Sequence, residues 1–277
     1  MSVELWTREL EARGTTRAGV HLLRTLVSQP DRASYSSAAQ VAELAGIDAS
    51  NVTRIAQGLG FTGWPGLQEE LRARYLKSLT LVEIADRHSG DAASGPVERS
   101  IEADRRALGL LDVDAGVCSS VVAALASAGT RLAIGGGSFA AVAHIFASNC
   151  SLAGYPAAHL SEPGTLSNAI ARLTEGDVVV VFDFWRLYEG MKRAAKAARS
   201  RGATVVVVSD HPSTELTRPA THVLTVPSEG GAYFPTLAPA IVVANAICTE
   251  LGLLDPEHTR NAIRRSERIW TEMDVMG

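Results

Sequence analysis

The segment SSAAQVAELAGIDASNVTRIAQGLGF, residues 36–61, contains two short helical patterns with a glycine between them. The serine pair at its start can cap a first helix that runs to Ala45, because a hydroxyl there accepts backbone N–H groups of the first turn. Gly46 suits a left-handed turn. Asp48 can cap a second helix, whose positive end favours a carboxylate. The segment therefore predicts two helices joined by a tight turn.

This layout is typical of a DNA-binding helix-turn-helix, in which the second helix enters the major groove and presents its early residues to base edges. Asn can pair with adenine, Arg can pair with guanine or phosphate, and Ser and Thr serve either. The candidate DNA-binding residues are Ser37, Asp48, Ser50, Asn51, Thr53, Arg54 and Arg72. A helical hairpin whose polar face is only solvated fits the spacing equally well.

The charge of the chain is unevenly distributed. The first 80 residues hold nine Lys and Arg against eight Asp and Glu, a formal charge of +1, which leaves 17 against 22, or −5, for the rest. A domain that binds nucleic acid mainly through its charge is much more basic than this. The case for DNA therefore depends on the fold of the first domain.

The composition of the 277-residue chain is that of a globular protein, with 46% hydrophobic and 20% charged residues. No stretch approaches the roughly 18 uninterrupted apolar residues of a membrane span, and the first residues lack the apolar core of a signal peptide. We expect a cytoplasmic protein with no membrane partner. Neither the three cysteines nor the seven histidines have a metal-binding spacing. We expect no metal and no cofactor.

The amino-acid composition changes at one point in the chain, which suggests a domain boundary there. Residues 87–96, RHSGDAASGP, are rich in Gly, Ser and Ala and end in a proline, which is typical of a linker. We expect a helical domain at residues 1–82, a linker at residues 83–96 and a second domain at residues 97–277.

The second domain alternates β-branched runs with helical segments. The runs at residues 177–182 and 204–209 are almost entirely valine, as in strands buried on both faces of a parallel sheet. Further strands are expected at residues 131–135 and 222–226, with helices between them. The pattern predicts a doubly wound α/β domain.

Residues 42–71, AELAGIDASNVTRIAQGLGFTGWPGLQEEL, resemble the helix-turn-helix of the RpiR/MurR family of transcriptional regulators. The signature of that family, R-x-x-x-x-LGF-x-G followed by an aromatic residue and a leucine, is met by Arg54, Leu59, Gly60, Phe61, Gly63, Trp64 and Leu67. Residues 97–277 are similar over nearly their whole length to the sugar-isomerase-type (SIS) domain of the same family.

The resemblance implies a fold and a function. The fold is a five-stranded parallel sheet of the SIS type, preceded by an all-α helix-turn-helix domain. The function is that of a transcriptional regulator, not an enzyme, which binds double-stranded operator DNA as a homodimer or homotetramer. A small-molecule effector, a sugar derivative or another anionic metabolite, would control it. The alternative is a sugar-phosphate isomerase of the SIS fold with an appended helical domain used for assembly.

Ligands of such sheets bind at the carboxyl ends of the strands. Gly135, Gly136, Gly137 and Ser138 follow the first strand, and their backbone N–H groups could hold an anion, although a tight turn alone would also need glycines. Relatives that hold phosphosugars have a Ser/Thr cluster after the next core strand. This chain has Asp-Phe-Trp-Arg-Leu-Tyr there instead, at residues 183–188. The usual phosphate-binding hydroxyls are missing, which argues against the isomerase alternative.

The replacing residues suggest a different ligand chemistry. Asp183 would repel a phosphate, Arg186 could pair with an anion, and Trp185 or Tyr188 could cover an apolar ligand face. The aromatic residues could also simply fill space over the sheet, with Arg186 in solvent. Thr236 lies near a helix expected to begin at Pro235, and its hydroxyl caps that helix more readily than it contacts a ligand. The candidate effector-binding residues are Gly135, Gly136, Gly137, Ser138, Asp183, Trp185, Arg186, Tyr188 and Thr236.

Overall fold

The computed structural model describes residues 2–80, 82–83, 95–185, 187–210, 215–231 and 233–275. The chain forms two compact units, Met1–His88 and Ser89–Gly277. The expected linker at residues 83–96 lies almost entirely outside the described residues, so the exact domain limits stay a prediction.

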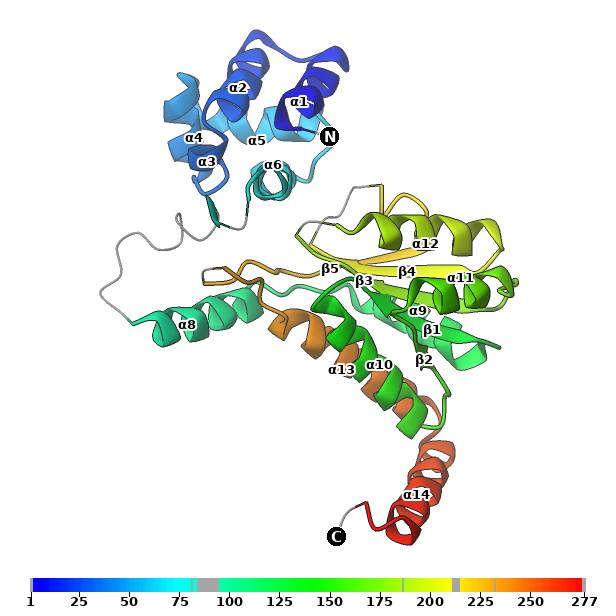
Figure 1. Ribbon diagram of the computed structural model, residues 1–277. Helices are drawn as coiled ribbons and strands as arrows, with labels where there is room; N and C mark the ends of the chain where they lie inside the picture. The colour runs from blue at the N-terminus through cyan, green and yellow to red at the C-terminus, as the bar shows by residue number, and fades with distance from the viewer. Residues whose placement is uncertain are drawn as a thin grey trace. The chain divides into compact units, whose positions relative to one another are not determined.

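The first unit is all-helical over its described residues (Figure 1). Its helices are α1 (Val3–Ala12), α2 (Arg17–Ser28), α3 (Pro30–Ala33), α4 (Ala38–Ala45), α5 (Ala49–Gly58) and α6 (Trp64–Ser78). Leucines of α2 and α6, together with Trp6 and Trp64, form one buried core. Such a core buries enough apolar surface to stabilise a small helical domain.

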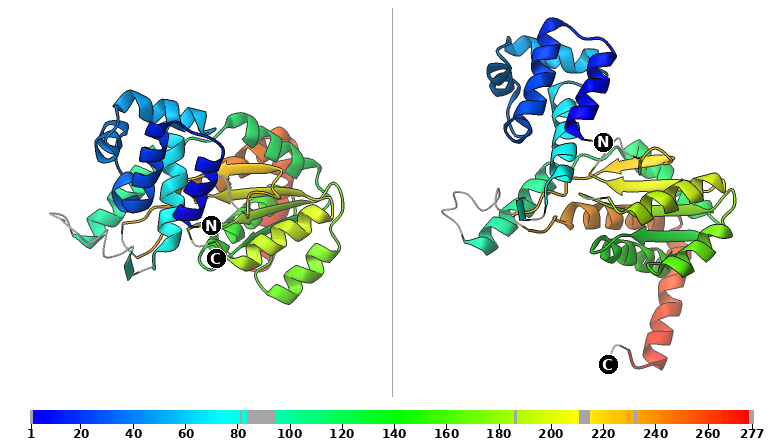
Figure 2. Two further views of the ribbon diagram at one scale, coloured as in Figure 1. Left: turned by 90° about the horizontal axis from the view of Figure 1, so that it is seen from above. Right: turned by 45° about the horizontal axis from the view of Figure 1, so that its top comes forward.

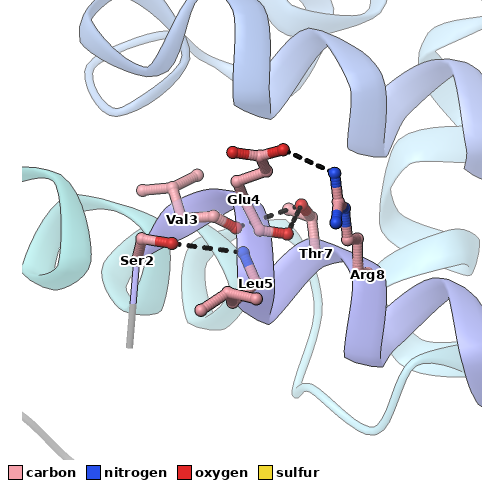
Figure 3. A network of polar contacts seen from close by, with 6 residues as sticks. All are labelled: Ser2, Val3, Glu4, Leu5, Thr7 and Arg8. Atoms are coloured by element: carbon pink, nitrogen blue, oxygen red, sulfur yellow. Dashed lines mark hydrogen bonds and ion pairs between the residues drawn. The ribbon is translucent and has the colours of Figure 1, made fainter.

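Local polar contacts determine where α1 begins. The Ser2 hydroxyl accepts a hydrogen bond from the backbone N–H of Leu5 at 3.3 Å, and the Thr7 hydroxyl donates to backbone carbonyls one turn earlier (Figure 3). On the exposed side, Arg8 pairs with Glu4 at 2.7 Å. The serine is thus an N-cap of the expected chemical type.

The second unit is a parallel sheet covered by helices. Its strands are β1 (Arg131–Gly135), β2 (Ala158–His159), β3 (Val178–Phe182), β4 (Thr204–Ser209) and β5 (His222–Thr225). Its helices are α8 (Pro96–Gly109), α9 (Ala115–Ser127), α10 (Phe139–Leu152), α11 (Pro163–Ala171), α12 (Glu189–Ser200), α13 (Ala238–Leu254) and α14 (Pro256–Glu272). The strand order is β2-β1-β3-β4-β5, and every neighbouring pair is parallel. The expected doubly wound, five-stranded sheet is confirmed.

The sheet separates two cores. Alternate residues of β3, such as Val178 and Val180, pack against α9, α10 and α13, whereas Val179 and Val181 pack against α11 and α12. Figures 1 and 2 show the two helical layers on opposite faces of the sheet. Burial on both faces explains why the strands are runs of valine and not alternating patterns.

Two details differ from the sequence-based expectation. The strand β2 has only two residues, Ala158 and His159, which is too short to produce a hydrophobic pattern. Helix α13 begins at Ala238 and not at Pro235, because the backbone N–H of Thr236 donates to the Ser228 carbonyl at 2.9 Å and is held outside the helix. The strand ends and the start of α13 thus lie on the same side of the unit.

Within the described residues, no single helix is long and apolar enough to span a membrane. The successive helices α13 and α14 meet the length and composition criteria only when taken together, and the chain bends by 108° between them.

Candidate DNA-binding helix and effector site

Helices α4 and α5 form the expected helix-turn-helix. The Ser37 hydroxyl accepts from the Gln40 N–H at 3.3 Å, while the Gln40 side chain accepts from the Ser37 N–H at 2.8 Å, so α4 begins with a reciprocal capping box. Gly46 ends α4 with a φ of 63°, the left-handed conformation that glycine adopts without strain. Asp48 then caps α5. Residues two or three positions apart in the sequence supply all of these hydrogen bonds.

The exposed side of α5 carries a connected set of polar groups. Asp48 Oδ1 accepts from both the backbone N–H and the hydroxyl of Ser50, at 2.8 and 2.6 Å. Arg54 Nη2 donates to Asn51 Oδ1 at 2.7 Å, and Arg54 Nε donates to the Ser50 carbonyl at 3.3 Å. The Ser50 hydroxyl holds the pKa of Asp48 below its ordinary value. Four of the expected DNA contacts, Asp48, Ser50, Asn51 and Arg54, are therefore neighbours at the start of α5.

The opposite side of α5 holds the helix in place. Val52, Ile55 and Ala56 are buried in the helical core, while Thr53 is exposed. Trp64 of α6 donates from Nε1 to the Ser36 carbonyl at 3.0 Å and so fixes the chain just before α4. The position of α5 is thus set by packing, and apart from the cap at Asp48 its outward polar residues are not needed to hold it.

Arg72 has a different environment from the one expected of a DNA contact. Its Nε and Nη2 atoms donate to the carbonyl of Ser34, at 2.9 and 2.7 Å, and its guanidinium lies 4.9 Å from the Tyr35 ring centre. Arg74 is also engaged: it pairs with the buried Glu70 and lies over the Trp6 ring, and burial lowers its pKa to about 10. Both arginines thus stabilise the helical unit itself.

In the SIS unit, the glycine loop (residues 135–138) lies between β1 and α10, at the carboxyl ends of the strands. Its carbonyl groups accept more hydrogen bonds than the sequence suggests. Gly137 has a φ of 54°, which turns the chain from β1 into α10. The first N–H groups of α10 donate back into the loop: Phe139 to the Gly136 carbonyl at 3.0 Å and Ala140 to the Gly137 carbonyl at 3.3 Å. The first-turn donors of α10 are thus engaged, whereas the N–H groups of Gly136, Gly137 and Ser138 are not among the hydrogen-bonded groups of the loop, so the anion cradle stays a prediction. Gly135 is buried at the end of β1, and Ser138 is exposed at the start of α10.

Tyr188 packs directly against this loop. A Cβ atom added to Gly136 would lie 2.6 Å from the Tyr188 Cγ, and one added to Gly137 would lie 3.1 Å from its Cζ. No side chain fits at such a distance, so the glycines are needed for the close approach of the ring. Tyr188, which was expected to cover an apolar ligand face, covers the loop, and 47% of its surface is still exposed.

Two carboxyl groups pin the loop that follows β3. Asp183 is fully buried, and its Oδ2 accepts from the Tyr188 N–H at 2.7 Å. Asp210, at the end of β4, accepts from the Trp185 N–H at 3.1 Å and from the Ser228 hydroxyl. Burial raises the pKa of Asp183 to about 8, and the negative charge of Asp210 adds to that shift. Sequence analysis did not identify Asp210 or Ser228, although Asp210 stands at the end of a valine strand, where ligands of such sheets bind.

Of the three remaining effector-site candidates, the structure describes Trp185 and Thr236 but not Arg186. Trp185 is buried and has a φ of 59°, so it fills space in the loop and is not an open ligand surface. Thr236 is buried, and its Oγ1 accepts from the Ala238 N–H at 3.1 Å, the expected helix-capping role. Arg186 lies outside the described residues. In the described part of the chain, no group of three or more His, Cys, Asp or Glu residues is arranged to hold a metal ion.

Comparison with family models accounts for both units. Residues 10–78 match the helix-turn-helix domain of the rpiR family, and residues 124–248 match the SIS domain. The chain thus combines an RpiR-family helix-turn-helix domain with an SIS domain. The RpiR match covers α4, the turn and α5, and the SIS match covers the sheet from the end of α9 to α13.

Solved structures share the fold. The SIS domain of an RpiR transcription factor from Sphaerobacter thermophilus is 24% identical, with a TM-score of 0.57, over 62% of this chain and 96% of that one. Vibrio vulnificus NanR, solved with ManNAc-6P, is 14% identical with a TM-score of 0.61, over 98% of this chain and 99% of that one. The search of curated proteins found no match.

Proposed function

We propose that this RpiR-family regulator reads operator DNA with the outward residues of α5, namely Ser50, Asn51, Thr53 and Arg54. The observation that carries the proposal is the construction of α5: its apolar side is buried in the core, while its early polar residues face outward and hydrogen-bond among themselves. A helix built in this way can enter a major groove without unpacking its own domain. Ser37 and Asp48 contribute as caps whose first-turn N–H groups would face phosphates.

We propose that the SIS unit senses a small sugar derivative or another anionic metabolite at the carboxyl ends of β1, β3 and β4. The relative solved with ManNAc-6P supports a carbohydrate-type ligand. In a homodimer or homotetramer, a ligand that favours one arrangement of the SIS units would change the spacing of two α5 helices. That spacing must match half-sites about one helical turn of DNA apart, so the ligand would control binding.

Selection of bound duplexes from a random library tests the DNA-reading proposal. The full-length protein should enrich a defined sequence, and Arg54→Ala should bind the enriched duplex about 10- to 100-fold more weakly, as expected for a lost guanine or phosphate contact. The control Arg8→Ala removes the same charge from α1, where Arg8 pairs with Glu4, and should bind normally. Equal binding by Arg54→Ala and the wild-type protein would refute the assignment of α5.

We further propose that the SIS unit acts as a sensor and not as an isomerase. The missing Ser/Thr cluster and the use of Asp183 and Asp210 as loop anchors support this view. Robust interconversion of aldose and ketose phosphates by the purified protein would contradict it.

A further inference from the structure

The ring of Tyr188 occupies the space above the glycine loop. Its atoms stand where a Cβ of Gly136 or Gly137 would be, so ring and backbone are in direct contact. An anion bound by backbone N–H groups needs a similarly close approach to the peptide units, which is why glycines are used in such loops. Ring and anion therefore compete for the same side of this loop.

Several contacts hold the ring in this place. The backbone N–H of Tyr188 donates to the buried carboxyl group of Asp183 at 2.7 Å. The Tyr188 ring packs edge to face against Phe139, the first residue of α10, with 6.5 Å between the ring centres. Phe139 packs in the same way against Phe184, with 5.0 Å between the ring centres. Such edge-to-face contacts stabilise an aromatic pair beyond the burial of its surface. The position of Tyr188 is thus built into the loop.

The N–H groups in the first turn of α10 are engaged as well. The N–H groups of Phe139, Ala140 and Ala141 donate to carbonyls three residues earlier, at 3.0, 3.3 and 3.1 Å. A phosphate at this helix end would have to displace those bonds as well as the ring. It would also lie at the edge of the sheet that holds the carboxyl groups of Asp183 and Asp210.

We propose that Tyr188 is a specificity-determining residue that closes the glycine loop to phosphate, so that the effector of this protein carries no phosphate at this position. The exposed half of the ring is then available to an unphosphorylated, polyhydroxylated ligand, because an aromatic ring can pack against the C–H groups of a sugar while its hydroxyl forms hydrogen bonds. This inference rests on the proposed role of the SIS unit as the effector domain.

Calorimetric titration of the full-length protein with inorganic phosphate, and separately with ManNAc-6P, tests the inference. Tyr188→Ala removes the ring and should bind inorganic phosphate at least about tenfold more tightly than the wild-type protein, a difference of about 1.4 kcal/mol. Tyr188→Phe keeps the ring and is the matched control, so it should exclude phosphate as the wild-type protein does. ManNAc-6P should follow the same order.

Two results would overturn the inference: equal phosphate affinity of the wild-type protein and Tyr188→Ala, or a gain in Tyr188→Phe as large as that in Tyr188→Ala. Because the Tyr188 side chain is half-exposed, we expect all three proteins to fold, and circular dichroism of each preparation checks this. Binding of the enriched duplex by the same preparations distinguishes a failure of the proposed regulator function from a failure of the proposed role of Tyr188. If DNA binding is intact and the phosphate result fails, only the role of Tyr188 is refuted.

Discussion

The recognition helix α5 and the effector edge of the SIS unit, which is formed by Gly136, Asp183, Tyr188 and Asp210, are built differently. They differ in how far apart in sequence their interacting residues lie. On α5, Asp48, Ser50 and Arg54 contact residues two to four positions away. At the effector edge, Asp210 holds Trp185 from 25 positions away, and Tyr188 packs on a loop more than 50 residues earlier. A site of the first kind is determined locally, whereas a site of the second kind exists only once the sheet has formed. Variants in both regions test this difference.

The largest effect is expected from Asp183→Asn at high pH. Burial raises the pKa of Asp183 to about 8, against an ordinary value of 3.8. Between about pH 4 and pH 8 the folded protein keeps a proton that the unfolded chain has lost, so the stability of the SIS unit should fall as pH rises through this range. Asp183→Asn cannot ionise and should be more stable than the wild-type protein above pH 8, by on the order of a few kcal/mol.

Urea denaturation of both proteins at several pH values measures the effect of Asp183→Asn. The curves should converge near pH 4 and separate as pH rises. A constant difference across this range would show that the neighbouring groups, among them Asp210 and Lys192, do not leave Asp183 protonated.

Arg72→Ala should destabilise the helical unit, because Arg72 supplies two hydrogen bonds to the carbonyl of the fully buried Ser34. Loss of these bonds is expected to lower the free energy of unfolding by about 1–3 kcal/mol. Chemical denaturation measures the loss, and Arg8→Ala, which removes an exposed arginine, serves as the control. An unchanged stability combined with weaker DNA binding would instead return Arg72 to the DNA-binding surface.

Gly136→Ala should destabilise the SIS unit by about 1–3 kcal/mol, because the added methyl group meets the Tyr188 ring. In the Tyr188→Ala background the same change should cost at least about 1 kcal/mol less, since the ring is gone. The four proteins of this cycle are compared by thermal unfolding. Additive effects would show that the ring and the loop are not in contact.

The smallest effect is expected from Ser37→Ala, which removes one half of the capping box of α4. The hydroxyl and the Gln40 side chain each satisfy one backbone N–H, so the loss should be about 1 kcal/mol. Ser37→Asp keeps an acceptor and should restore most of this stability. If both variants lose the same amount, the capping box does not define the start of α4.

The sequence was informative where local chemistry decides the structure. The caps at Ser37 and Asp48 and the left-handed turn at Gly46 follow from side-chain types alone, and all three are confirmed. The valine strands β3 and β4 were predictable for a similar reason, since burial on both faces imposes a continuous apolar run. The strand β2 was not, because two residues paired by tertiary contacts leave no periodic pattern.

The effector edge was predictable only in outline. The sequence predicts that Gly136 and Tyr188 follow strands of the same sheet, but no local pattern indicates that the ring lies on the glycines. It also gave Arg72 to the DNA-binding surface, because a lone arginine on a helix carries no sign of the carbonyl it will bind. Both contacts depend on residues more than 30 positions apart, and such pairs are determined by packing and not by the local sequence.

If α5 is the element that reads bases, then Asn51 is the residue whose loss should change base preference. The Asn51 side chain is half-buried and lies in the first turn of the helix, where its Oδ1 accepts a hydrogen bond from Arg54 Nη2. Duplex selection with Asn51→Ala, run beside the wild-type protein and Arg8→Ala, measures base preference at each operator position. We expect Asn51→Ala to lose preference at one base pair of each half-site, by about 1–3 kcal/mol, while Arg8→Ala keeps the wild-type profile. An unchanged profile for Asn51→Ala would contradict this role of α5.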